Sequence, residues 1–243
     1  MRLFGLIGYP LSHSFSKRYF TEKFEKERLV DCAYENFPIV SIEKIKTILQ
    51  NYPTLKGLNV TIPYKEQVIP FVDDASDTVK EIQACNCIKI TNGKLFGYNT
   101  DIPAFEKSLK KELQPHHNKA LVLGTGGSAK AIEFVLKKNN IEYRQVSRKV
   151  SGEKLSYEQV TEAMIEEHTL IINTTPLGMF PDISKFPLIP YDALSSKHFL
   201  FDLIYNPAKT LFLQKGEEKG ATIKNGLEML ILQAEESWRI WNS

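Results

Sequence analysis

A glycine-rich turn in the middle of the chain has the composition of a binding site. Residues 124–129 read GTGGSA and fit the pattern G-x-G-x-x-A, between the apolar run 120–123 and a helix-forming stretch. Gly124 would permit the tight bend, Gly126 would let the backbone approach a pyrophosphate, and Ala129 would keep helix and strand close. The alternative is an ordinary glycine-rich turn. The strand before it and the helix after it favour a dinucleotide site, with Gly127 and Ser128 at the helix start.

The residues after the next predicted strand indicate which dinucleotide would bind. Ser147, Arg148 and Lys149 follow a strand that ends at Val146. A site selective for NAD usually has Asp or Glu here, which holds the ribose hydroxyls. A guanidinium and an ammonium group suit a 2′-phosphate instead. The alternative is two solvated basic residues in a loop, but their position after the second strand of this half favours NADP.

Lys65 and Asp101 are the candidates for acid–base chemistry. A lysine ammonium can give a proton to a developing alkoxide, and a carboxylate beside it can orient both groups. Lys65 is predicted at a helix start, where its charge opposes the helix dipole, and such an unfavourable placement hints at a function. Asp101 precedes Ile102-Pro103, so on spacing alone a helix cap explains it better, and it could serve both purposes.

Several short motifs together resemble the shikimate dehydrogenase family over nearly the whole chain. Each motif alone is weak, whereas their order and spacing are highly specific. Besides the glycine-rich turn they are GYPLSHSFS (8–16), NVTIPYKE (59–66), ACN (84–86), GYNTD (97–101), NTTP (173–176), DLIYNP (202–207) and NGLEMLILQ (225–233). Membership of this family would imply NADP-dependent, reversible reduction of 3-dehydroshikimate to shikimate, a step toward aromatic amino acids.

The resemblance also implies roles for individual residues. Lys65 and Asp101 would be the catalytic pair. Ser14 and Ser16, with Tyr205 assisting, would hold the substrate carboxylate, although on their own the two serines would be an ordinary polar turn. The ring hydroxyls would be bound by Asn59, Thr61, Asn86, Asp101 and Gln233. The cofactor would contact Gly124, Gly126, Gly127, Ser128, Ala129, Ser147, Arg148, Lys149, Thr174, Leu203, Gly226 and Met229.

The sequence departs from the family pattern at a few of these motifs. Ser147 stands where an asparagine usually precedes the phosphate-binding arginine, and Glu228 replaces a glycine of the last motif. These changes bear on cofactor affinity and leave the expected reaction class unaltered.

Composition excludes several other classes of protein. The chain has 243 residues, 31 basic and 29 acidic, and shows no basic stripe, so we expect no nucleic-acid partner. No segment approaches a membrane span, and no signal peptide is recognised. Three cysteines make a disulfide framework improbable and favour the cytoplasm. Neither the C-x-C spacing nor the adjacent His116 and His117 favours a metal site. A small-molecule substrate, and a monomer or homodimer, are expected.

The order of predicted elements indicates an α/β fold with two domains. Strands are predicted at 3–8, 33–37, 58–62, 86–91, 94–98, 120–123, 143–146, 170–173 and 199–203. Helices are predicted at 16–27, 41–50 with Ser41 as cap, 65–71, 101–113, 128–138 and 227–241. We expect a substrate domain of residues 1–101 plus 227–243 and a Rossmann-like, doubly wound NADP domain of residues 102–226, with the active site in a cleft between them.

Three other functions remain open on the sequence. One is a quinate/shikimate dehydrogenase that uses NAD. Another is a folate-dependent methylene dehydrogenase, against which the double-serine motif argues. The last is a non-catalytic protein that binds NADP or shikimate, against which the presence of both Lys65 and Asp101 argues.

Overall fold

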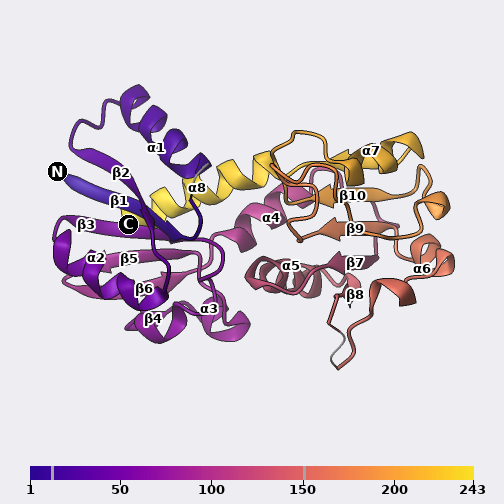
Figure 1. Cartoon of the computed structure of the whole chain (residues 1–243), viewed down its shortest axis with the longest axis horizontal. Coiled ribbons are helices and arrows are strands. Elements are labelled where there is room, and N and C mark those ends of the chain that lie inside the picture. The colour runs from indigo at the N-terminus through magenta and orange to yellow at the C-terminus, as the bar shows by residue number, and fades with distance from the viewer. Residues whose placement is uncertain (12–13, 150–151) are drawn as a thin grey trace. The chain divides into compact units, whose positions relative to one another are not determined.

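A computed structural model describes residues 1–11, 14–149 and 152–243 of the chain (Figure 1). Ser12 and His13 of the first motif lie outside these ranges. The chain forms two compact units, and we describe each by itself. Unit 1 contains Met1–Thr100 and Ala234–Ser243, and unit 2 contains Asp101–Gln233. The last helix, α8 (Leu227–Trp241), therefore begins in unit 2 and ends in unit 1.

Unit 1 is built on a mixed sheet with the strand order β2-β1-β3-β5-β6-β4. Its strands are β1 (Arg2–Gly8), β2 (Cys32–Pro38), β3 (Leu55–Val60), β4 (Asp74–Ala75), β5 (Cys87–Thr91) and β6 (Lys94–Tyr98). Its other helices are α1 (Phe15–Lys26), α2 (Ile45–Asn51) and α3 (Asp77–Ile82). Strand β1 pairs in parallel with β2 and β3, whereas β5 pairs antiparallel with β3 and β6.

The two faces of this sheet bury different kinds of side chain. One face packs aliphatic residues such as Leu58 and Ile88 against Ile45 and Ile48 of α2. The other face carries an aromatic cluster in which α1 and the end of α8 take part. That cluster contains Phe4, Phe20, Phe24, Tyr34, Trp238 and Trp241. The two faces bury different sets of side chains, so a shift by one residue would move every core side chain to the wrong face, and this fixes the strand register.

Unit 2 is built on a parallel sheet with the order β11-β10-β9-β7-β8. Its strands are β7 (Lys119–Leu123), β8 (Glu142–Val146), β9 (Leu170–Asn173), β10 (Phe199–Asp202) and β11 (Thr222–Lys224). Its helices, besides the start of α8, are α4 (Asp101–Leu109), α5 (Gly127–Lys138), α6 (Glu162–Glu167) and α7 (Leu211–Glu218). This is a Rossmann-like sheet, so the predicted α/β fold class is confirmed.

The strand order reverses between β7 and β9. The chain runs outward from β7 to β8 and then returns to place β9 on the other side of β7. Ligands of doubly wound sheets bind beyond the carboxyl ends of the strands at such a reversal. The glycine-rich turn follows β7, and Thr174 follows β9, so both lie at this point of the sheet.

Some predicted elements are corrected by the structure. Residues 65–68 form turns and only Ile69–Phe71 is a 3-10 helix, so Lys65 does not begin a helix and opposes no dipole there. Residues 41–50 divide into a 3-10 turn and α2, and the Ser41 hydroxyl bonds Glu43 instead of capping the backbone. Helix α4 ends at Leu109, four residues before the predicted end.

Within residues 1–11, 14–149 and 152–243, none of the helices is both long and apolar enough to cross a membrane. In the same residues, no cluster of three or more histidine, cysteine, aspartate or glutamate side chains is placed to hold a metal ion.

Candidate active site

The first helix of unit 1 begins at the two predicted carboxylate-binding serines. Ser14 is the N-cap of α1, and its hydroxyl oxygen accepts a hydrogen bond from the backbone N–H of Lys17 at 3.4 Å. Its own O–H remains able to donate to a ligand. Ser16 lies in the first turn and is buried. The N–H groups at the start of a helix favour an anion, so this end of α1 suits a carboxylate.

Thr61 and Lys65 lie in the turns that follow β3. A β-carbon at Gly8 would be 2.4 Å from Thr61 Cγ2, so the absence of a side chain at Gly8 allows Thr61 to approach the end of β1. The backbone carbonyl of Lys65 accepts a hydrogen bond from the N–H of Cys85 at 2.8 Å. Lys65 is thereby fixed beside the segment that carries Asn86, and both belong to unit 1.

Three predicted substrate residues belong to unit 2. Asp101 is the first residue of α4 and is buried. Gln233 lies on α8, where its Nε2 donates to the carbonyl of Leu230 at 2.9 Å. Tyr205 follows β10 in a loop. Unit 1 thus holds Ser14, Ser16, Asn59, Thr61, Lys65 and Asn86, whereas Asp101, Tyr205, Gln233 and every predicted cofactor residue lie in unit 2.

The glycine-rich turn has the backbone that its sequence predicts. Gly124 has a φ of +116°, a conformation that glycine adopts far more readily than other residues. Gly126 is the N-cap of α5, with ordinary φ and ψ of −82° and −178°. A β-carbon there would meet nothing within 4 Å, so neither backbone strain nor packing requires glycine at 126. Open space beside a helix N-terminus fits the pyrophosphate of a dinucleotide.

The basic residues after β8 are displayed to solvent. Arg148 and Lys149 are exposed, whereas Ser147 is buried and its hydroxyl accepts from the backbone N–H of Lys149 at 3.2 Å. The charge of Arg148 acts on Tyr157, whose pKa burial raises and the guanidinium lowers. An exposed guanidinium suits both the 2′-phosphate and the adenine of NADP.

The remaining predicted cofactor residues frame the same end of the sheet. The Thr174 hydroxyl donates to the carbonyl of Leu123 at 2.8 Å. A β-carbon at Gly226 would lie 2.0 Å from the carbonyl oxygen of Leu203, so these two backbones touch because residue 226 is glycine. Met229 is buried at the start of α8.

A buried carboxyl behind this end of the sheet was not predicted as a site residue. Asp202 Oδ1 accepts from Asn173 Nδ2 and from the N–H of Ile204, both at 3.0 Å, and Oδ2 accepts from the Thr210 hydroxyl at 2.6 Å. Burial raises the pKa of Asp202 to about 7, although these three bonds act in the opposite direction. Asn173 is the last residue of β9 and Asp202 the last residue of β10, and both belong to motifs of the family resemblance, NTTP and DLIYNP. A polar residue at the end of a strand within such a motif was the sequence signal that could have identified Asp202.

Glu228, which departs from the family pattern, is held by a set of partners within unit 2. Its carboxylate accepts from the Ser108 hydroxyl at 2.9 Å, pairs with Lys224 at 2.8 Å and also pairs with Lys111. Burial alone would raise the pKa of Glu228, but these partners outweigh it and lower the pKa to about 2. The start of α8 is thus tied to α4 and β11.

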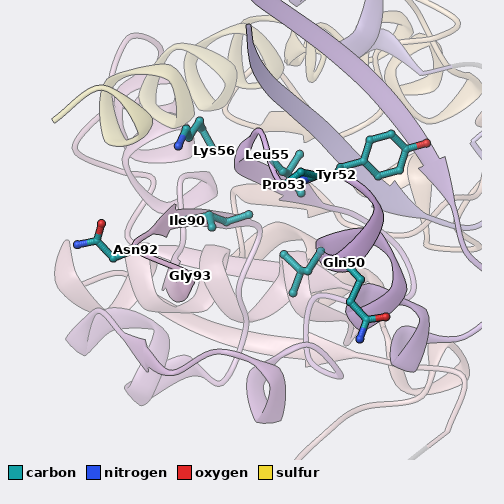
Figure 2. Close-up of a pocket in the computed structure, with 9 residues that line it drawn as sticks. Gln50, Tyr52, Pro53, Leu55, Lys56, Ile90, Asn92 and Gly93 are labelled. Carbon is teal, nitrogen blue, oxygen red and sulfur yellow. The ribbon is translucent and has the colours of Figure 1, made fainter.

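A hollow of about 410 Å³ lies elsewhere in unit 1, near the β5–β6 turn (Figure 2). It is lined by Leu49, Gln50, Tyr52, Pro53, Leu55, Lys56, Ile90, Asn92 and Gly93. Lys56 is the one charged side chain in this lining, and no predicted site residue is part of it. The hollow therefore offers no acid–base pair and is not the candidate active site.

The fold and the motifs define a two-unit, dinucleotide-dependent type of oxidoreductase, and comparison with known proteins gives the family. The family model "Shikimate dehydrogenase substrate binding domain" matches residues 6–88. A shikimate dehydrogenase (NADP(+)) of Methanococcus vannielii is 37% identical over an alignment of 260 positions, which covers 98% of this chain and 90% of that protein. One from Clostridium beijerinckii is 37% identical over an alignment of 251 positions, which covers 99% of this chain and 92% of that protein.

A solved structure agrees with these relatives over the full length of the chain. The shikimate 5-dehydrogenase of Thermus thermophilus, in complex with NADP(H) and shikimate, is similar with a TM-score of 0.88 and 30% identity. The match covers 99% of this chain and 93% of that one. The chain belongs to the shikimate dehydrogenase family.

Proposed function

We propose that the chain catalyses the NADP-dependent, reversible reduction of 3-dehydroshikimate to shikimate, a step in the formation of aromatic amino-acid precursors. The observation that carries the proposal is full-length similarity to shikimate dehydrogenases (NADP(+)), at 37% identity over 98% of this chain. The three cysteines described in the structure are free thiols, which supports a place in the reducing cytoplasm. We expect a monomer or homodimer.

In this proposal unit 1 binds the substrate. Ser14 and Ser16 at the start of α1 hold the carboxylate, with Tyr205 of unit 2 assisting. The amide and hydroxyl groups of Asn59, Thr61 and Asn86, with Gln233, hold the ring hydroxyls. A pocket rich in amides and hydroxyls discriminates well, because an analogue that lacks a hydroxyl leaves a buried polar group unpaired.

Unit 2 binds the cofactor. The open space at Gly126 and the N-terminus of α5 take the pyrophosphate, and Arg148 and Lys149 take the 2′-phosphate. Gly124, Gly127, Ser128, Ala129 and Ser147 shape these two segments, and Thr174, Leu203, Gly226 and Met229 are the other residues that would contact the cofactor. When bound, NADPH supplies the hydride that the ketone carbon receives.

Lys65 and Asp101 perform the acid–base step. As negative charge develops on the ketone oxygen, the Lys65 ammonium gives it a proton, and the reverse reaction returns that proton to the amine. Asp101 orients both the ammonium and the reacting oxygen. Electrostatic stabilisation of the developing alkoxide by a fixed ammonium is worth several kcal/mol in sites that exclude water.

The test is a spectrophotometric assay of the purified protein at 340 nm. Shikimate with NADP should give turnover, and NAD or quinate should give much lower kcat/KM. Preference for NAD, or equal use of quinate, would identify a quinate/shikimate dehydrogenase instead. Tight binding of NADP and shikimate without turnover would identify a non-catalytic binding protein.

A further inference from the structure

A chain of buried hydrogen bonds joins three elements of unit 1. The phenol of Tyr34 on β2 donates to Asn59 Oδ1 on β3 at 2.8 Å. The Nδ2 of Asn59 donates to the hydroxyl of Ser237 on α8 at 2.9 Å. Tyr34 and Asn59 are 3% and 4% exposed, and Ser237 is fully buried. Solvent is excluded from these bonds, so each depends on its protein partner.

The same chain reaches the residue before Asp101. The hydroxyl oxygens of Ser237 and Thr100 are 3.3 Å apart. The backbone N–H of Thr100 donates to Asn86 Oδ1 at 2.7 Å, and Asn86 Nδ2 donates to Thr100 Oγ1 at 3.0 Å. Two proposed substrate ligands, Asn59 and Asn86, are therefore linked through side chains that carry no assigned role.

Thr100 determines which end of the Asn86 amide remains available. A backbone N–H can only donate, so the atom of Asn86 that lies 2.7 Å from it must be the oxygen. The Thr100 hydroxyl lies 3.3 Å from the same oxygen. What remains is one N–H of Nδ2, because the other faces Thr100 Oγ1. Asn86 is thus set to donate to an oxygen of a ligand, such as that of a ring hydroxyl.

Asn59 is oriented from both sides of its amide. Its Nδ2 also points to the backbone carbonyl of Asn86, a group that can only accept, at 3.5 Å. Its Oδ1 faces the Tyr34 phenol, whose pKa burial raises well above the ordinary value, and the Ser16 hydroxyl is a further hydrogen-bond partner of that phenol. The phenol therefore keeps its proton and remains a donor to Asn59.

Packing alone does not require a hydroxyl at position 34. The Tyr34 ring is stacked on Phe20 at a centroid distance of 4.6 Å, inside the aromatic cluster. A phenylalanine would fill the same volume. Buried polar groups cost free energy unless every partner is satisfied, so an apolar pair would be the simpler way to close this core. The benefit of these hydrogen bonds must lie in the orientation that they give the two asparagine amides.

We infer that Tyr34 and Ser237 are positioning residues of the substrate site, which hold the Asn59 amide, and through Thr100 the Asn86 amide, in the orientation that reads the ring hydroxyls. The inference rests on the proposed function. Neither residue acts on the reacting atoms, since Ser237 works through Asn59 and Tyr34 through Asn59 and Ser16. Substrate recognition should therefore depend on them, whereas cofactor binding should not.

The experiment compares Tyr34→Phe and Ser237→Ala with the wild type in steady-state kinetics of the full-length protein. The KM for shikimate should rise roughly tenfold in each variant, as expected for the loss of one buried hydrogen bond. The KM for NADP should stay within twofold, and kcat should change much less than the KM for shikimate. Wild-type turnover tests the proposed function separately: an inactive wild type refutes the function, whereas an active wild type with unaffected variants refutes only the inference.

Phe24→Leu is the matched control for a purely structural effect. The Phe24 ring lies 5.3 Å from Trp238 in the same aromatic cluster, and its replacement removes no hydrogen bond. The thermal midpoint should fall, with the KM for shikimate unchanged. If both hydroxyl variants kept a wild-type KM for shikimate, or if Phe24→Leu raised that KM as much as they do, the inference would be wrong. The hydrogen-bond chain would then serve only the stability of the fold. Should Tyr34→Phe fail to fold, Ser237→Ala alone decides.

Discussion

The hydroxyl of Thr174 lies where a side chain on Gly124 would have to begin, since a β-carbon at position 124 would be 2.4 Å from Thr174 Oγ1. Gly124 also has a φ of +116°, which disfavours any other residue. The ends of β7 and β9 therefore meet because residue 124 has no side chain. Gly126, two residues further on, is under neither constraint.

This difference predicts opposite behaviour for two alanine variants. Gly126→Ala should keep the wild-type thermal midpoint, because the new methyl group meets no protein atom, but the KM for NADP should rise at least about tenfold, since the methyl takes space needed by the pyrophosphate. Gly124→Ala should destabilise the protein by roughly 1–3 kcal/mol. Thermal unfolding and NADP titration measure both effects. If Gly126→Ala bound NADP normally, the pyrophosphate would have to lie elsewhere.

Replacement of Lys65 should remove the proton donor and leave binding intact. We expect Lys65→Ala to lower kcat by about 10²–10⁴, the usual contribution of a general acid, with little change in the dissociation constant of shikimate. Stopped-flow turnover and calorimetric titration give the two quantities. Lys94→Ala, at an exposed lysine of the same unit, is the control. Near-normal turnover in Lys65→Ala would exclude this lysine from the mechanism.

Arg148 should select the cofactor. Arg148→Ala should weaken NADP binding by roughly 1.5–3 kcal/mol, because a charge-assisted bond to the 2′-phosphate is lost, and leave NAD nearly unaffected. The measurement is kcat/KM for both cofactors, with Arg144→Ala, an exposed arginine on β8, as the matched control. Equal losses for NAD and NADP would show that Arg148 shapes the loop and does not bind the phosphate.

Asp202 should make stability depend on pH. Its pKa is raised from 3.8 to about 7, so between these values the native carboxyl holds a proton that the unfolded chain has released. The stability that this carboxyl contributes is fully present below its pKa in the unfolded chain, 3.8, and is lost as the pH rises through about 7. Burial lowers the pKa of His117, which has the opposite effect on stability, so only a comparison with a variant isolates Asp202.

The corresponding measurement is the free energy of unfolding of the wild type and of Asp202→Asn in urea, between pH 4 and pH 8. If the native carboxyl is protonated at low pH, the free energy of unfolding of the wild type minus that of Asp202→Asn should fall as the pH rises. A constant difference across this range would mean that Asp202 is ionised throughout and is stabilised by its three hydrogen bonds.

The long, strongly patterned elements could be predicted from the sequence, and the short ones could not. Helix α8 was predicted with its observed bounds because its apolar stripe spans four turns, and Asn92-Gly93 located the β5–β6 hairpin. Helices α3 and α6 are only six residues long, too short for a 3.6-residue period to be recognised. Residues 65–68 have apolar neighbours at helical spacing, yet the hydrogen bond from the Cys85 N–H to the Lys65 carbonyl holds them in turns.

Candidate site residues could be proposed from the sequence only where a backbone requirement or a motif indicated them. The tight bend at Gly124 is a local property of the turn that the sequence predicted, and the structure gives this residue a positive φ. The hydrogen bonds that link Tyr34 through Asn59 to Ser237 join residues 203 positions apart in the sequence, and no local pattern relates them. Such partners become visible only when β2 and β3 take their places on either side of β1 in the sheet and α8 covers them.

The route of α8 has a consequence for the order in which the protein can form on the ribosome. Residues 234–243 complete unit 1, since Trp241 stacks on Phe4 at 4.9 Å and its indole donates to the carbonyl of Ile88. Most of unit 1 is synthesised before unit 2, yet unit 1 cannot close its aromatic core until residues 234–243 have left the ribosomal tunnel. The half with the glycine-rich turn is contiguous in sequence and can finish first. Nascent chains should therefore become able to hold a dinucleotide before they can hold an acid substrate.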